Sequence, residues 1–252
     1  MTEMKYELLL EKTKNQPTKI NKKMVEIKNV AVYDLKESVI ACRNAMRTQM
    51  PGYTNEEFEA SLQTAMKLVG RTAKDPHVKC HDNFLTGIRV SFDIIYPQYF
   101  SPELQRYHFA DIVTSASKMH RLMSLNLEKC CNKYVSQVQI NECQKYIDTY
   151  NRLAHWPEET PFSGIDFTLR DGSVIHDVHI NDALYHARIL ALSNCPSGLE
   201  LFMRVSTNYK QLQTIYWQRR DHRLIEDWRE GFINGLIKKL PYYKEFITGG
   251  EE

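Results

Sequence analysis

The order of patterns along the chain predicts a single α/β domain. Apolar and polar residues alternate over Val25–Tyr33 and again over Ile88–Ile94, and this period is typical of half-buried strands. Helix signals follow the strands: Asp34 opens a capping box, and Ser101–Pro102 supplies an N-cap with a first-turn proline. Because no repeat or low-complexity linker interrupts this alternation, we expect residues 25–252 to form one domain.

Apolar residues at helical spacing and capping residues predict the helices, and a further alternating segment predicts a strand over Leu199–Val205. The expected helices cover residues 34–47, the segment that opens at Thr54, the segment from Ser101 that carries Arg106, residues 122–153 in two pieces, a helix through Leu192 that Asn181 or Asp182 caps, residues 208–219 and residues 224–239.

A β-hairpin is predicted near residues 165–180. Two strand-like runs, Ile165–Leu169 and Val174–Ile180, flank the sequence Arg-Asp-Gly-Ser. The Asp171–Gly172 pair in this sequence is a strong hairpin signal, because both residues tolerate the positive φ that a tight turn requires.

Composition limits the environment of the protein. The 252 residues are 42% hydrophobic and 25% charged, as in an ordinary folded domain, and the formal net charge of +2 gives no reason to expect nucleic acid as a partner. Residues 1–24 form a polar, lysine-rich segment whose apolar run, Leu8–Leu10, is too short for a signal sequence or a membrane span. The six cysteines contain no C-x-x-C pair. We therefore expect a cytoplasmic protein with free thiols that does not bind membranes.

A histidine, a strand and a basic segment follow one another between residues 81 and 119. His81 precedes the strand at Ile88, and Arg106-Tyr107-His108 follows that strand. This order resembles the flavin-dependent thymidylate synthases (thymidylate synthase complementing proteins), which carry a histidine before a strand and an R-H-R-x7-S motif after it. In the matching register the first arginine is retained and four later positions differ: Tyr107 replaces the histidine, His108 the second arginine, Ala116 the serine and Lys118 a following arginine.

Two further stretches resemble the same family. Ala187-Arg188-Ile189-Leu190 is similar to the family's A-R-x-x-L-P segment, without the proline. Residues 208–229 resemble its N-x-R-x-L...L-R-x-D-x-H-A-Q-x-E-I block. Asn208, Leu212, Arg219 and Asp221 match that block, whereas Lys210, Arg223 and Asp227 stand where the family has arginine, histidine and glutamate.

The resemblance implies a fold, a reaction and an assembly. The fold is of the α+β type, with a central mixed or antiparallel sheet flanked by helices, to which this chain adds the hairpin. The reaction transfers a methylene group from methylenetetrahydrofolate to C5 of dUMP and reduces it with FAD and NADPH. The assembly is a homotetramer with active sites shared between subunits.

The resemblance also assigns roles to residues. Arg219 is the expected catalytic residue; Arg188, Arg219 and Lys118 are expected to bind the nucleotide substrate; and His81, Arg106, His108, Asn208 and Arg223 are expected to bind FAD. Arginine suits these roles because its planar, permanently charged group matches phosphate oxygens. Ala116 supplies no donor, and one lost charged hydrogen bond costs roughly 1.5–3 kcal/mol.

Other interpretations compete with this one. The degraded motif also fits an inactive or repurposed homologue that acts as a binding or assembly protein, or a different nucleotide-modifying reaction on the same scaffold. The arginines are each compatible with ordinary surface or helix-pairing roles, and acidic residues interleave with those between residues 219 and 229. We expect no metal site, because His176 and His179 point to opposite faces of a strand. The remaining metal candidates are His77, Cys80 and His81.

Overall fold

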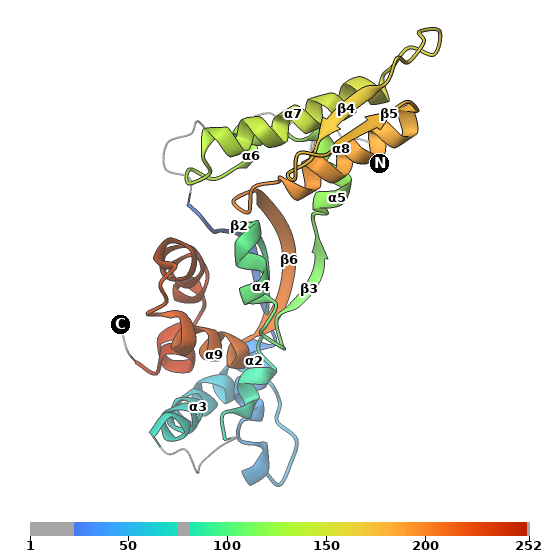
Figure 1. The fold of residues 1–252 in the computed structure, drawn as a ribbon. Coiled ribbons are helices and arrows are strands. Elements are labelled where there is room, and N and C mark those ends of the chain that lie inside the picture. Colours follow the sequence, from blue (N-terminus) through green and yellow to red (C-terminus); the bar gives the residue numbers. More distant parts are fainter. Residues whose placement is uncertain (1–22, 75–80, 251–252) are drawn as a thin grey trace.

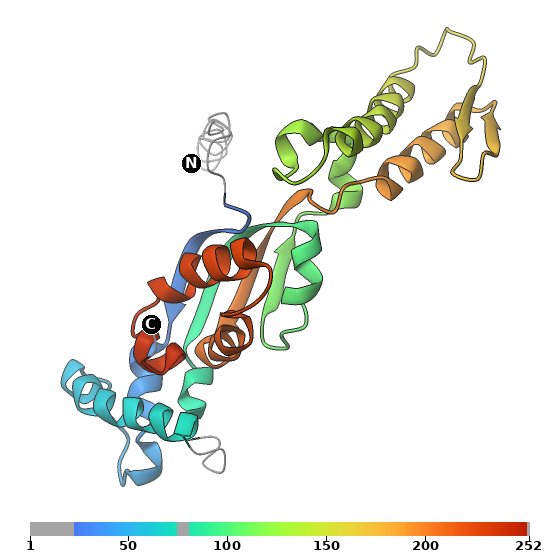
Figure 2. The same ribbon diagram turned by 60° about the vertical axis from the view of Figure 1, so that its left-hand side comes forward.

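The computed structural model describes residues 23–74 and 81–250 of the chain. The predicted polar segment at residues 1–24 lies outside this part, except for Lys23 and Met24. The described chain has two regions (Figures 1 and 2): a body built on a sheet, and an arm that projects from one end of it.

The sheet of the body is antiparallel, with the strand order β1-β2-β6-β3. Its strands are β1 (Glu26–Tyr33), β2 (Arg89–Pro97), β3 (Asp111–Ser115) and β6 (Glu200–Asn208). The predicted α/β fold with an antiparallel sheet flanked by helices is therefore confirmed. The alternation in β2 has the expected cause, because Val90, Phe92 and Ile94 are buried while the residues between them are partly exposed.

Helices flank the sheet and connect its strands. They are α2 (Leu35–Ala41), α3 (Asn55–Lys74), α4 (Ser101–Leu104), α9 (Tyr209–Arg219), and the π-helical segments Glu226–Ile233 and Lys244–Thr248. Two further short helices, α5 (Lys118–Arg121) and α6 (Leu127–Cys130), lie near the base of the arm (Figure 1). Short 3-10 turns cover Asn44–Met46, Asn83–Thr86, Gln98–Phe100, Leu122–Ser124 and Ile237–Lys239. Among the described residues, none of the helices combines the length and apolar character needed to cross a membrane.

The main core lies between the sheet and the C-terminal helices. Trp228 is fully buried there, with its ring centroid 4.6 Å from that of Phe100 and 5.4 Å from that of Phe232. Gly231 allows the π-helical segment to approach Val25, which directly precedes β1, because a Cβ at this position would lie 2.6 Å from Val25 Cβ. The opposite face of the sheet is more polar, and Arg204 and Asp93 form an ion pair of 3.1 Å on it.

The arm consists of two long helices and the predicted hairpin. Its elements are α7 (Gln137–Ala154), β4 (Ile165–Thr168), β5 (Val174–Asp177) and α8 (Ile180–Ser193). Phe167, Leu153, Ala183 and Ala187 form a small buried cluster that is separate from the main core. At the base of the arm, residues of α7 and α8 join the main core instead.

Some element boundaries differ from the sequence prediction. The helix expected over residues 34–47 ends at Ala41, and α4 ends before Arg106 because the chain turns to bury Tyr107. His179 rather than Asn181 or Asp182 is the N-cap of α8, since Ile180 packs against the arm cluster and joins the first turn. Strand β3 was not expected.

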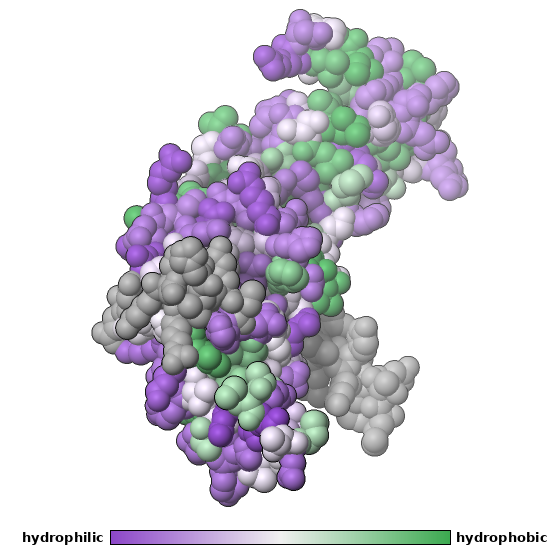
Figure 3. Space-filling model, turned by 90° about the horizontal axis from the view of Figure 1, so that it is seen from below, coloured by the Kyte–Doolittle hydropathy of each residue, from purple (hydrophilic) through white to green (hydrophobic). Residues whose placement is uncertain are grey.

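In the view from below, hydrophilic residues predominate and hydrophobic ones form separate patches (Figure 3).

Candidate functional site

The N-terminal end of α9 brings together two of the residues predicted to bind FAD. Asn208 ends β6 and caps α9, and its Oδ1 atom accepts a hydrogen bond of 2.8 Å from the Gln211 backbone N–H. In the first turn of α9, Lys210 Nζ lies 2.5 Å from Oδ2 of the fully buried Asp82. Asp82 follows the exposed His81 directly, so this ion pair holds His81 near the start of α9.

The Arg106-Tyr107-His108 segment lies beside the same helix. The next residue, Phe109, is fixed at both backbone groups: its N–H donates to Gln211 Oε1 at 3.2 Å, and its carbonyl accepts from Thr207 Oγ1 at 2.8 Å. Arg106 and His108 are exposed, whereas Tyr107 between them is only 7% exposed. The segment therefore directs two basic side chains outward and one aromatic ring into the core.

Arg219, near the other end of α9, is held by the body itself. Its Nε atom donates to the Tyr107 hydroxyl at 2.7 Å, and its Nη1 atom lies 3.2 Å from Glu103 Oε2. The guanidinium also lies over the rings of Tyr107 and Trp228, at 5.6 and 4.7 Å from their centroids. With a side chain only 14% exposed, Arg219 has few donors left for a ligand.

Glu103 connects Arg219 to two further side chains. Its Oε2 atom also accepts a hydrogen bond of 2.7 Å from Trp228 Nε1 and lies 3.7 Å from His222 Nε2. Sequence reasoning missed Glu103, because nothing in its neighbourhood on α4 indicates a partner more than a hundred residues away. Arg223 lies just beyond α9 and is exposed.

Asp227, which stands at the family's glutamate position, is buried against Tyr99. The Tyr99 hydroxyl donates a hydrogen bond of 3.0 Å to Asp227 Oδ1. Burial raises the pKa of the Asp227 carboxyl, and the hydrogen bond from Tyr99 offsets part of this effect. Burial and the nearby Asp227 carboxylate raise the pKa of Tyr99 as well.

The two other residues predicted to bind substrate lie away from α9. Arg188 is exposed on α8 of the arm, where its Nη2 atom donates to the Tyr150 hydroxyl at 3.0 Å and its guanidinium lies 5.1 Å from the centre of the Tyr150 ring. Lys118 begins α5 and is partly buried. Figures 1 and 2 both show α8 and α9 at different ends of the molecule. One chain therefore does not bring Arg188 and Arg219 together.

Ala116, at the position of the family's serine, follows β3 directly. Its backbone N–H donates a hydrogen bond of 2.8 Å to the Phe202 carbonyl, so the main chain here continues the pairing of β3 with β6. The methyl side chain adds no donor. Neither this residue nor the half-buried Lys118 supplies the fork of donors that a serine and an arginine would present to a phosphate.

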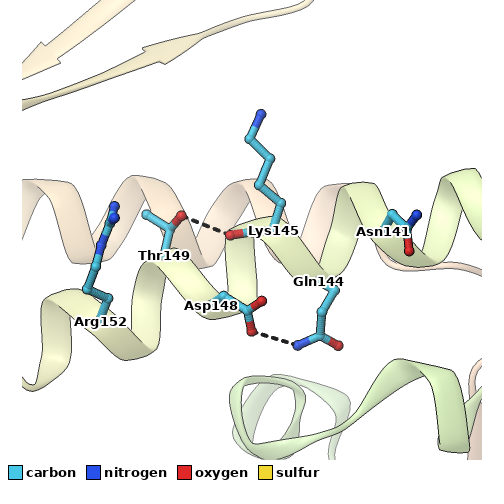
Figure 4. Close-up of a pocket in the computed structure, with 6 residues that line it drawn as sticks. All are labelled: Asn141, Gln144, Lys145, Asp148, Thr149 and Arg152. Carbon is cyan, nitrogen blue, oxygen red and sulfur yellow. Dashed lines mark hydrogen bonds between the residues drawn. The ribbon is translucent and has the colours of Figure 1, made fainter.

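A hollow of about 540 Å³ lies along the surface of α7, and none of these residues lines it. Figure 4 shows that its side chains fan out from the helix rather than converge on one point. Two of its contacts are internal to the helix: Gln144 to Asp148 at 2.9 Å, and Thr149 to the Lys145 carbonyl at 2.8 Å. We interpret it as a groove on a solvated helix surface.

The metal candidates that the structure describes are not grouped. Within the described ranges, no three side chains of His, Cys, Asp or Glu are placed to share an ion. His176 pairs with Asp166 across the hairpin, with 2.5 Å between Nδ1 and Oδ1. His77 and Cys80 lie outside the described residues.

Comparison with known proteins relates the fold to solved structures. No protein-family model matches the sequence, and no curated protein sequence matches it. The structure is similar to the flavin-dependent thymidylate synthase ThyX from Helicobacter pylori complexed with FAD and dUMP, with a TM-score of 0.52 and 14% identity, over 88% of this chain and 97% of that chain. A second structure of ThyX from Helicobacter pylori with FAD and dUMP has a TM-score of 0.50 and 14% identity, over 92% and 100% of the two chains. The protein thus has a fold like that of ThyX.

Proposed function

We propose that this protein binds FAD and a pyrimidine deoxynucleotide and carries out one-carbon transfer and reduction at C5 of the pyrimidine, from dUMP to dTMP or in a related reaction. One observation carries the proposal. On a fold shared with FAD- and dUMP-bound ThyX, basic residues from three separate stretches lie around the single helix α9: His81, the pair Arg106 and His108, and Arg223.

The donors around α9 fit FAD in charge and exposure. Arg106 and Arg223 are permanently charged and exposed, as binding of a pyrophosphate requires, and the exposed rings of His81 and His108 add hydrogen-bonding nitrogens. We propose that these four residues, with the Asn208 amide, hold the cofactor. Bound FAD would supply the hydride, NADPH would reduce it, and methylenetetrahydrofolate would supply the carbon.

Arg188 and Lys118 are proposed to hold the nucleotide phosphate of a site that a second copy completes. Both lie toward the arm, whereas the residues proposed for FAD surround α9. A site that uses both groups therefore needs two chains, and we propose a homotetramer. Light scattering that shows a monomer in the presence of FAD and dUMP would contradict this assembly.

Arg219 is proposed to act on the pyrimidine with the donors that remain to it. Its contacts with Tyr107 and Glu103 fix the plane of the guanidinium, so a donor that faces substrate needs no reorganisation when the ligand binds. We also propose that the protein acts in the cytoplasm, where its described free cysteines would stay reduced.

The second candidate function is a binding or assembly protein that keeps the fold without the chemistry. The enclosure of Arg219 between Tyr107, Trp228 and Glu103 favours it, because a guanidinium with committed partners supports packing as readily as catalysis. The missing donor at Ala116 favours it as well. Such a protein would show no turnover.

The visible absorption spectrum of the purified protein, recorded during titration with FAD and then with dUMP, tests the proposal. We expect a bound-flavin spectrum that shifts when dUMP is added. Arg106→Ala should weaken the flavin signal, whereas Arg170→Ala, at an exposed arginine of the hairpin turn, should leave it unchanged. Binding of FAD without formation of dTMP would favour a changed reaction, and no FAD binding would favour the binding or assembly protein.

A further inference from the structure

A hollow of about 770 Å³ lies between the body and the base of the arm, and none of the residues proposed to bind FAD or nucleotide lines it. Its lining comes from α6, the loop after α6, the start of α7, the first residue of β6 and the π-helical segment Glu226–Ile233. A volume of this size is typical of small-molecule sites. Four glutamates and three lysines line the hollow, so it suits a ligand that carries both charges rather than an anion.

The π-helical segment forms a wall of hydrogen-bond acceptors. Glu226, Glu230 and Asn234 recur every four residues along this segment and its C-cap, and all three line the hollow. The Oδ1 atom of Asn234 is buried and has no hydrogen-bond partner among the described residues. Because carboxylate and amide oxygens accept hydrogen bonds, this wall fits the ammonium and N–H groups of a ligand.

The loop after α6 forms a wall of donors. Asn132 is only 7% exposed, and its backbone N–H donates to the Gly198 carbonyl at 3.0 Å. Its Oδ1 atom accepts a hydrogen bond of 3.0 Å from the Tyr134 backbone N–H, which identifies the oxygen end of the amide. The Nδ2 atom is buried and finds no partner within the described ranges. With Lys129 and Lys133, which also line the hollow, it fits the C=O and carboxylate groups of a ligand.

Direct contacts join the two walls. Lys133 Nζ lies 2.9 Å from Glu226 Oε2, and the Tyr134 hydroxyl donates a hydrogen bond of 2.7 Å to Glu226 Oε1. The charges of Lys133 and Glu226 therefore neutralise each other, whereas Glu230 and Lys129 are exposed. The buried side chains of Met24 and Ile140 add apolar surface to the lining.

We propose that this hollow binds a short peptide with free ends. A peptide bond offers one N–H and one C=O, which match the unpaired Asn234 Oδ1 and Asn132 Nδ2 atoms. The terminal ammonium matches Glu230, and the terminal carboxylate matches Lys129. Buried amide atoms without partners cost free energy, and a ligand of this chemistry supplies the missing hydrogen bonds. The inference does not rest on FAD or nucleotide binding, since it uses different residues.

Isothermal titration calorimetry of the full-length protein with tri-L-alanine tests the proposal. This probe has both free ends, internal peptide bonds, and methyl groups for the apolar part of the lining. We expect it to bind, and we expect the N-acetylated, C-amidated form to bind about tenfold more weakly or worse, because the caps remove charged hydrogen bonds. No heat of binding at millimolar concentrations would overturn the proposal. Equal binding of the capped form would overturn it as well, since an internal segment of a protein would then fit the hollow.

Two asparagine variants test the assignment of donor and acceptor. Asn132→Asp keeps the oxygen that accepts from Tyr134 but loses the free donor, and it should weaken binding of tri-L-alanine by about tenfold or more. Asn234→Asp keeps its acceptor and should bind at least as tightly as the wild type. The control is Asn181→Asp, the same change at an exposed residue of α8 outside the hollow, and it should match the wild type.

Folding and flavin binding of the same variants complete the test. Circular dichroism establishes that each variant is folded. The FAD titration of Asn132→Asp should equal that of the wild type, so failure of this site is distinguishable from failure of the proposed function. Unchanged peptide binding in Asn132→Asp, or a loss in Asn234→Asp alone, would overturn the proposed arrangement.

Discussion

The body and the arm bury apolar side chains to very different extents. The body packs its sheet against the C-terminal helices in one large core that includes Trp228, Phe92 and Phe232, whereas the buried cluster of the arm contains only four residues. Hydrophobic stabilisation follows the apolar area removed from water, so the arm draws much of its order from its base, where Cys143 and Ala191 join the main core. The comparison teaches that the two proposed halves of the site differ in the packing that supports them. The half around α9 lies on the large core of the body, whereas the half on α8 lies in an arm with a small buried cluster of its own.

Removing the indole of Trp228 should have the largest effect. Trp228→Ala would leave a cavity between Phe100 and Phe232 and would remove the hydrogen bond to Glu103. We expect a loss of about 3–5 kcal/mol in the free energy of unfolding, measured by chemical denaturation. The control is Trp217→Ala, at a partly exposed tryptophan, and an equally large loss there would contradict the central place of Trp228.

Phe167→Ala tests how far the arm depends on its own cluster. Phe167 is the largest of its four residues, and its truncation should cost about 2–4 kcal/mol. Hydrogen exchange should then accelerate in the hairpin and in the adjoining parts of α7 and α8, while β2 and β6 keep their protection. Equal acceleration in the sheet would show instead that the arm and the body unfold as one unit. That result would agree with the sequence prediction that residues 25–252 form one domain.

Replacing an arginine of the body, Arg219, and one of the arm, Arg188, should have unequal effects on stability. Arg219→Ala would break charged contacts in a half-buried cluster and should cost about 1.5–3 kcal/mol. Arg188→Ala removes an exposed side chain and should change stability by about 0.5 kcal/mol or less. If both residues serve the proposed site, both variants should nonetheless lose the dUMP-induced change in the flavin spectrum, and a normal response in Arg188→Ala would remove the arm from that site.

The smallest expected effect is a pH dependence that arises in the body. Because burial raises the folded-state pKa of Asp227 above its unfolded value, its contribution to stability is fully present at low pH and is lost as the pH rises through the folded-state pKa. Asp227→Asn should remove this component and change stability at neutral pH by about 1 kcal/mol or less. Denaturation curves at mildly acidic and neutral pH measure it, and an unaltered pH profile would contradict the assignment.

The sequence predicts those elements whose pattern reflects their own burial. Strand β2 alternates because one face packs on the core, and the Asp171–Gly172 turn follows from local backbone preference. Strand β3 escaped prediction because all five of its residues are exposed and leave no periodic signal. Likewise, the contact between Glu103 and Trp228 joins residues far apart in the chain, so only the folded structure reveals it. The resemblance indicated Arg188 and Arg219 but not their separation, which depends on how the arm leaves the sheet.

Strand β3 also limits how copies of this chain can associate. It is an edge strand, and such strands expose backbone N–H and C=O groups with which another chain can pair. Here the edge is short, begins with the charged Asp111, and shifts register between Ile112 and Thr114, which leaves Val113 out of the ladder. A bulge of this kind twists and interrupts the edge. The strand therefore offers a poor template for open-ended sheet growth, and it protects the protein from aggregation at a side where a straight, apolar strand would promote fibres.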